Sequence, residues 1–469
     1  MSHSSDRTTR TDDRTQFAGG GKLFKIGAVL AVAGLGLALV VGFGGPTPFR
    51  RFLFSYLVAL AYFLSLALGS LAFVLLQHVT RAGWSVGVRR IAENIAGTLP
   101  ALGVLALPIV ISVIIGNGYL YRWAIPETSE RMDPRALEAA AKGEDEVPPT
   151  AAEAKAARAA AGQVTVEEKA QTGPENPKDF KLDPLILMKR NFGLHWLAPW
   201  FFILRVVVYF VVWAWIAVWY RNQSIQQDKT GDANITLAMQ ARSGPALVAL
   251  GLTLTFGSFD LLMSLDPHWY STIFGAYYFA GCAVSSYALI TLFVYLLQRS
   301  GYLRESISIE HYHDLGKYMF AFTFFYGYIA FAQYMLLWYA NLPETTEWMA
   351  RHGASTAHPN EFSKVIVAIL FCKILIPFAG QLSRHVKRAR GLLAFWAVWI
   401  LVFQFVDMYW IVMPELRGIG LAPRPTDLFC LIGVGGVFLA VLGRRMGSAS
   451  LRPLADPRLP ETLAHVNAY

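Results

Sequence analysis

The sequence predicts an all-α polytopic membrane protein with about ten transmembrane helices. Its 469 residues are 55% hydrophobic and only 16% charged, whereas soluble domains carry about 25% charged residues. The apolar residues form runs of about 20 residues, which is the length that crosses about 30 Å of hydrocarbon. These runs lack the period of two that barrel strands show. They cover residues 26–43, 52–76, 95–115, 194–219, 245–265, 273–297, 318–339, 365–379, 392–413 and 427–442.

The runs divide the chain into a basic tail (1–25), three helices (26–125), an insertion (126–190), seven helices (191–443) and a second tail (444–469). The first run has no small-residue cleavage site, so we expect it to remain as a span. Pro100 and Pro108 interrupt the third run, and the eighth and tenth runs are short. The Ala-rich insertion lacks a wide apolar face, so we expect it to be partly disordered or to lie on a partner.

The distribution of Lys and Arg predicts the orientation in the membrane. The even-numbered loops and the two tails are rich in these residues, whereas the short odd-numbered loops contain few of them. Because Lys and Arg are retained in the cytoplasm, both termini should be cytoplasmic. The net charge of +9 therefore sets topology and does not indicate nucleic-acid binding.

The cysteines and histidines do not indicate a cofactor bound by this chain. Cys282, Cys372 and Cys430 fall inside the apolar runs, and the sequence contains no CxxC or CxxCH motif. Such motifs hold iron–sulfur clusters or attach c-type haem. Only His195 lies near the interior of a run, so a transmembrane haem with two His ligands is not expected.

Polar side chains inside the apolar runs are the candidates for a functional site. A charge in a span costs about 2.5–3.5 kcal/mol on insertion scales, so it is rarely present without a function or a partner. The candidates are Asp260 and Ser264 in the fifth run, Gln404 and Asp407 in the ninth, Lys373 in the eighth, His195, Arg205 and Tyr209 on one face of the fourth, and Thr323, Tyr326 and Gln333 on one stripe of the seventh.

Three interpretations of these residues remain open. Arg205 and Lys373 could neutralise Asp260 and Asp407 as structural ion pairs. The same groups could form a proton path with Asp260 as central carrier, because buried carboxylates can exchange protons with hydroxyls, amides and water. Contact with a ligand or a lipid headgroup is the third interpretation.

The string DPHWY that follows Asp260 by six residues marks a membrane surface. Asp266 and Pro267 are residues typical of a helix start. His268, Trp269 and Tyr270 follow them, and the two aromatic residues fit an interfacial belt. We therefore expect residues 266–270 at the periplasmic face.

Three segments together resemble one known family. They are SFDLLMSLDPHWYSTIFGAYYFAG (258–281), RNFGLHWLAPWF (190–201) and the segment from FTFFYGYIAF to NLPETT (322–346). They are similar to the ActF subunits of bacterial alternative complex III, which resemble the NrfD and polysulfide-reductase membrane subunits. Asp260 lies in the matching motif, whereas Lys373, Asp407 and Arg205 are selected by their chemistry alone.

The resemblance implies two four-helix bundles with flanking helices. It also implies an ActC-like integral subunit, periplasmic subunits with iron–sulfur clusters and multihaem cytochrome c, and quinone or quinol as the small molecule. The expected function is a membrane subunit of a quinol:cytochrome c oxidoreductase complex with a proton path. A stand-alone secondary transporter and a purely structural membrane anchor remain as alternatives.

Overall fold

A computed structural model describes residues 13–43, 49–126, 184–191, 195–355, 359–416 and 421–466. Within these ranges the regular structure is helical, and ten helical segments are long and apolar enough to cross a membrane. The chain is therefore an all-α polytopic membrane protein, as predicted. Most of the insertion expected at 126–190 lies outside the described residues.

The spans are helical over the following bounds. They are α1 (Gly20–Phe43), α2 (Arg50–Val79), the broken third span α3 (Val86–Ala96), α4 (Leu99–Leu105) and α5 (Leu107–Ile115), then α10 (Pro199–Thr230), α11 (Asn234–Leu261), α12 (Phe274–Arg299), α13 (Ile309–Ala340), the eighth span α15 (Phe362–Ala368) and α16 (Ile376–Gly380) around a π-helical turn (Ile369–Leu375), α18 (Arg390–Val412) and α19 (Pro425–Gly447). Short helices α9 (Pro184–Asn191), α14 (Pro343–Arg351), α17 (Arg384–Arg388) and α20 (Leu459–Leu463) lie between or after them.

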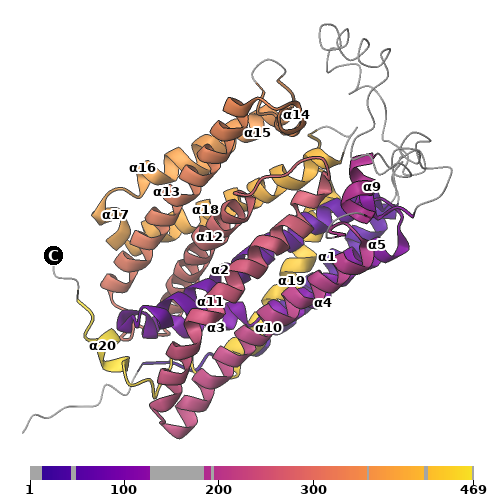
Figure 1. Ribbon diagram of the computed structural model, residues 1–469. Coiled ribbons are helices and arrows are strands. Elements are labelled where there is room, and N and C mark those ends of the chain that lie inside the picture. Colours follow the sequence, from indigo (N-terminus) through magenta and orange to yellow (C-terminus); the bar gives the residue numbers. More distant parts are fainter. Residues whose placement is uncertain are drawn as a thin grey trace, which may run out of the picture.

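The spans form two four-helix bundles with two flanking helices, as the resemblance implied (Figure 1). The first bundle contains α2, the broken third span, α10 and α11. The second contains α12, α13, the eighth span and α18. The two bundles meet along α2 and α12, and α1 packs against α19 beside them.

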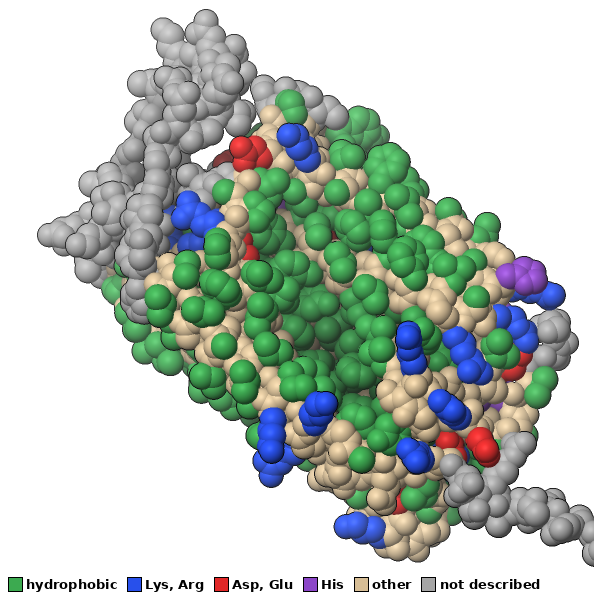
Figure 2. All heavy atoms as spheres, turned by 180° about the vertical axis from the view of Figure 1, so that it is seen from behind, with side chains coloured by type: hydrophobic (Ala, Val, Ile, Leu, Met, Phe, Trp, Pro, Cys, Tyr) green, Lys and Arg blue, Asp and Glu red, His purple; other side chains and the backbone are tan. Residues whose placement is uncertain are grey.

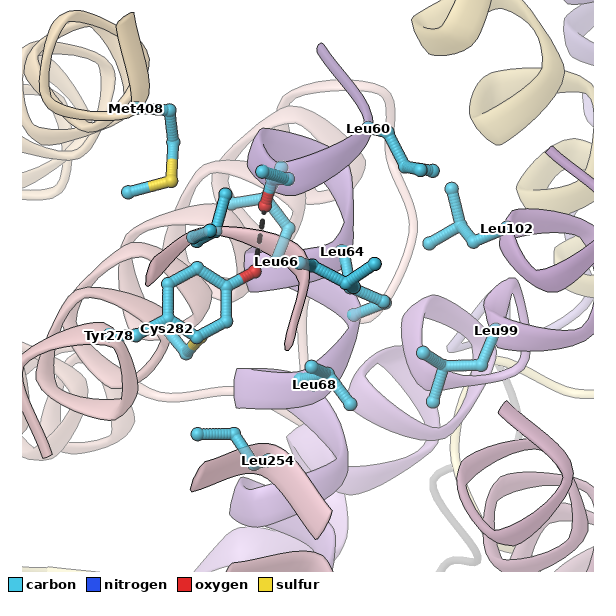
Figure 3. Packing of buried hydrophobic residues seen from close by; sticks show 14 of the residues in the cluster. Leu60, Leu64, Leu66, Leu68, Leu99, Leu102, Leu254, Tyr278, Cys282 and Met408 are labelled. Carbon is cyan, nitrogen blue, oxygen red and sulfur yellow. Dashed lines mark hydrogen bonds between the residues drawn. The ribbon is translucent and has the colours of Figure 1, made fainter. Parts of the chain in front are cut away.

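Helix α2 is the central element of the fold because it contacts both bundles and is buried along nearly its whole length. Its leucines pack against leucines of the third span and of α11 (Figure 3). On the α12 side, the Tyr278 hydroxyl donates to the Ala61 carbonyl oxygen at 2.9 Å. A Cβ at Gly69 would lie 2.0 Å from the Cys282 carbonyl oxygen, so glycine permits the close approach of α2 and α12.

Glycines also explain how α1 is held, since α1 is otherwise largely exposed. Gly20, Gly27 and Gly34 recur every seven residues on the face toward α19. A Cβ at Gly27 or Gly34 would lie 2.4 Å from a backbone nitrogen of α19. Small residues that let helix backbones approach are typical of helix pairs in membranes.

Gly27→Leu is therefore expected to separate α1 from α19 and to lower the midpoint of thermal unfolding. Inserting side-chain atoms into a packed site ordinarily costs about 1–3 kcal/mol, and here the obstacle is backbone that cannot move aside. The matched control is Gly36→Leu on the same helix, because a Cβ at Gly36 meets nothing within 4 Å. Equal midpoints for the two variants would contradict this account of the α1 interface.

The described parts of the two terminal segments lie at the same end of the molecule. The Leu303 amide donates to the Arg14 carbonyl oxygen at 3.3 Å, and the Leu451 amide donates to the Thr15 carbonyl oxygen at 2.7 Å.

Hydrophobic side chains cover the middle of the face in Figure 2, and Lys and Arg gather mainly toward one end. We refer to the end that holds residues 80–85, 300–308 and 448–466 as the tail end, and to the other as the α14 end.

Candidate functional site: two buried ion-pair clusters

The first buried cluster joins α10 to α11 through Asp260, which is 0% exposed. Arg205 binds this carboxylate in a bidentate manner: its Nε donates to Oδ2 and its Nη2 to Oδ1, each at 2.8 Å. The Tyr209 hydroxyl donates to Oδ2 at 2.8 Å. The predicted members Asp260, Arg205 and Tyr209 are thus brought together, and both oxygens of the carboxylate are occupied.

Aromatic rings fix the Arg205 guanidinium in place. Its Cζ lies 4.0 Å from the centroid of the Trp196 ring and 4.4 Å from that of Phe201. Arg205 Nη2 also donates to the Trp196 carbonyl oxygen at 2.7 Å. A planar guanidinium in a bidentate and stacked setting is strongly constrained in its orientation.

The surroundings of this first cluster are mostly apolar or already hydrogen-bonded. Ser264 donates its hydroxyl to the Asp260 carbonyl oxygen at 2.5 Å. Thr253 accepts from Trp213 Nε1 at 2.8 Å. A small cavity beside Gly257 is lined largely by leucines of α2 and α11. The groups around Asp260 therefore hold it in position and offer few free sites for a proton relay.

The second buried cluster lies inside the other bundle, around Asp407 of α18. Lys373 Nζ donates to Asp407 Oδ2 at 2.5 Å and to Gln404 Oε1 at 2.8 Å. The Tyr326 hydroxyl donates to Asp407 Oδ1 at 2.9 Å, and the Tyr277 hydroxyl donates to the same oxygen. Asp407 is 0% exposed and Lys373 2%, so this charge pair is enclosed by protein.

Each helix of the second bundle supplies a residue to this cluster. Tyr277 lies on α12, Tyr326 on α13, Lys373 on the π-helical turn of the eighth span, and Asp407 on α18. The wider π-helical turn is a feature often found at functional sites. Tyr277 was not predicted, because an aromatic residue in an apolar run does not differ in sequence from a packing residue. Gln404 Nε2 extends the cluster to Ser65 of α2 at 3.4 Å.

The two clusters differ in the proton chemistry that they allow. An arginine side chain stays protonated in proteins, so Asp260 has a permanent bidentate counter-charge. A lysine ammonium can lose its proton, and Lys373 touches Asp407 through one nitrogen only. Two tyrosine hydroxyls, 2.8 Å apart, also meet at Asp407. The second cluster is therefore the better arrangement for proton exchange, and the first resembles a structural ion pair.

Three predicted residues lie beside these clusters or away from them. Thr323 is one turn from Tyr326 and donates to the Met319 carbonyl oxygen at 2.8 Å. Gln333 is 7% exposed, and its Oε1 has no hydrogen-bond partner among the described residues. His195 differs from the expectation: it is exposed, has a φ of 48° and precedes α10, which begins at Pro199. It therefore does not share a helical face with Arg205.

The predicted helix start at Asp266 is wrong, because α12 begins at Phe274. Asp266 Oδ1 instead accepts from the His268 amide at 3.0 Å, which closes a local turn. Trp269 is buried and stacks on Trp348 with ring centroids 3.9 Å apart, whereas Tyr270 is exposed as an interfacial residue would be. A local turn thus lies where the helix cap was expected.

Arg351 of α14 links the ends of the two bundles, which sequence reasoning missed. It donates to Asp266 and, at 3.4 Å, to Glu415 Oε2. Burial raises the pKa of Asp266, but the hydrogen bond from His268 and the charge of Arg351 hold that pKa well below its usual range. Burial lowers the pKa of the neighbouring His352 to about 3, so its ring is neutral at pH 7.

The two bundles repeat one arrangement of charges. In each bundle the basic residue lies on the third of the four helices in chain order (α10 or the eighth span), and the aspartate lies on the fourth (α11 or α18). Each of these fourth helices then leads into a 3-10 turn, Met263–Leu265 after α11 and Met413–Glu415 after α18. An acidic residue at the end of each turn, Asp266 or Glu415, contacts Arg351. The sequence itself shows no repeat, so this similarity is visible only in the structure.

No model of a known protein family matches the chain, and no curated protein matches it in a sequence comparison. Within the described ranges, no group of three or more His, Cys, Asp or Glu side chains is placed to hold a metal ion.

Proposed function

We propose that this chain is an integral membrane subunit of a respiratory quinol:cytochrome c oxidoreductase complex and that its second bundle carries part of a proton path. The observation that supports this proposal most strongly is the enclosed contact of Lys373 with Asp407, together with two tyrosine hydroxyls. Oxidation of quinol releases protons, and a membrane subunit with an exchangeable buried carboxylate can move them. The sequence resemblance to ActF subunits supports the same assignment.

The proposal includes partners and an orientation. Neighbouring subunits would be an ActC-like integral protein and periplasmic proteins with iron–sulfur clusters and multihaem cytochrome c. Quinone or quinol would be the small molecule in contact with the complex, and lipids would cover the apolar faces. The tail end would face the cytoplasm of a bacterial inner membrane, because Lys and Arg concentrate there.

A structural anchor is the second candidate, and the Arg205–Asp260 pair is the observation that favours it. That bidentate pair ties α10 to α11 without leaving an exchangeable counter-charge. We assign this role to the first bundle only. A stand-alone transporter would use similar buried charges, but it would function without haem-bearing partners.

Affinity purification of the tagged chain from native membranes in mild detergent tests membership in the complex. The expected result is co-isolation of subunits with c-type haem spectra and with iron–sulfur signals, together with quinol:cytochrome c activity. A homogeneous chain that is isolated alone, folded and without haem absorbance would contradict the proposal and favour the transporter.

A further inference from the structure

A group of buried polar atoms without hydrogen bonds lies where α2 and α12 approach the tail end. Both amide atoms of Gln77 and the Tyr287 hydroxyl are buried and have no hydrogen-bond partner among the described residues. Each of these side chains is only 2% exposed. Neither residue belongs to the two clusters described above.

These atoms need a partner, because buried polar groups are hydrogen-bonded with few exceptions. Tyr287 packs on Phe73, which precedes Gln77 by one helical turn on α2, and on Tyr318, with ring centroids 5.3 and 4.9 Å from its own. An amide and a phenol provide donors and acceptors for the two to four hydrogen bonds that a buried water makes. Water is the ligand that matches this chemistry.

The position of this pair relates it to the second cluster. Gln77 lies within one helical turn of the exposed residues Thr80 and Arg81. Tyr287 follows Tyr277 by ten residues on α12, which is about 15 Å at the helical rise. Its ring stacks on Phe322, the neighbour of Thr323 on α13. The pair therefore lies between the tail-end surface and the Asp407 cluster.

We infer that Gln77 and Tyr287 hold a buried water that connects the tail-end surface to the Lys373–Asp407 cluster. The inference rests on the proposed proton role of Asp407. A proton that arrives on this water passes by way of Thr323 to Tyr326, whose hydroxyl donates to Asp407. At each step an oxygen gains one proton and releases another, so its charge does not change. The hydroxyls must then reorient before the next proton can pass.

X-ray hydroxyl-radical footprinting of the intact complex in membranes tests the water directly, because radicals form where water is present. Tyr287 is expected to be modified several-fold faster than Tyr278, a buried tyrosine of the same helix whose hydroxyl is already bonded to Ala61. Gln77→Leu should reduce the modification of Tyr287. Equal rates for the two tyrosines would overturn the water site, whatever the proton role of Asp407.

Proton translocation by reconstituted complexes tests the connection. Gln77→Leu and Tyr287→Phe are expected to slow translocation several-fold, whereas Gln77→Ser, which supplies a hydroxyl in place of the amide and adds room for water, should retain it. Normal translocation in Gln77→Leu, with Asp407→Asn inactive, would overturn the connection and leave the proposed function standing. Normal translocation in Asp407→Asn would overturn the proposed function, and the connection with it.

Discussion

Asp407→Asn is expected to abolish proton translocation while the complex still assembles and oxidises quinol in detergent. Asparagine has nearly the same shape: its Oδ1 can still accept from Tyr277 and Tyr326, and its Nδ2 can donate to a neutral Lys373 amine, so packing should persist. It cannot take up a proton as a carboxylate does, and Lys373 can avoid an unpaired buried charge by losing its own proton. Assembly is measured by subunit composition, and turnover by reduction of the periplasmic acceptor.

Asp427→Asn is the matched control for this prediction. Asp427 is also a buried aspartate in a span with a basic partner, since Arg51 Nη2 donates to it at 2.7 Å and Ser55 at 2.5 Å. It belongs to α19, outside both bundles. Similar losses of translocation in Asp407→Asn and Asp427→Asn would indicate a general structural effect and would contradict a specific role for Asp407.

The second large effect is expected for Arg205→Met, which should lower the free energy of unfolding by about 3–5 kcal/mol, because removing one partner leaves an uncompensated buried charge. Asp260 would then keep the hydrogen bond from the Tyr209 hydroxyl but lose its counter-charge. Thermal or denaturant unfolding of the purified protein measures this loss.

The double variant Arg205→Met/Asp260→Leu separates the loss of the pair from the loss of one partner. Apolar replacement of a whole buried ion pair is often neutral, so this variant should recover most of the stability and should retain proton translocation. Loss of translocation in a stable double variant would contradict the structural role and would restore Asp260 as a proton carrier.

The sequence predicted the helical spans well because a membrane imposes strict rules on length and polarity. It also selected Asp260, Arg205, Asp407 and Lys373, since charges in apolar runs are conspicuous. Their pairing could not be predicted: the partners lie 55 and 34 residues apart in the chain, and two acids with two bases allow more than one combination.

The predictions that were wrong, and the contacts that the sequence could not predict, concern residues whose surroundings are set by the tertiary structure. Asp266 suited a helix cap locally, but Arg351 of α14, which is distant in the sequence, binds its carboxylate. His195 was placed on a helix that begins only after Ala198. Tyr277 gained its role only when folding brought it to Asp407. Such contacts form only in the folded chain, where residues distant in the sequence meet a buried charge.

Measuring the protons moved per electron in proteoliposomes shows whether protons pass through the second bundle at Asp407. Wild type, Asp407→Asn and the stable Arg205→Met/Asp260→Leu variant would be reconstituted side by side, with a pH-sensitive dye recording protons and acceptor reduction recording electrons. Translocation in Asp407→Asn is expected to fall to the passive leak of protein-free liposomes, while the double variant matches wild type. A wild-type ratio of protons to electrons in Asp407→Asn would contradict proton passage at Asp407.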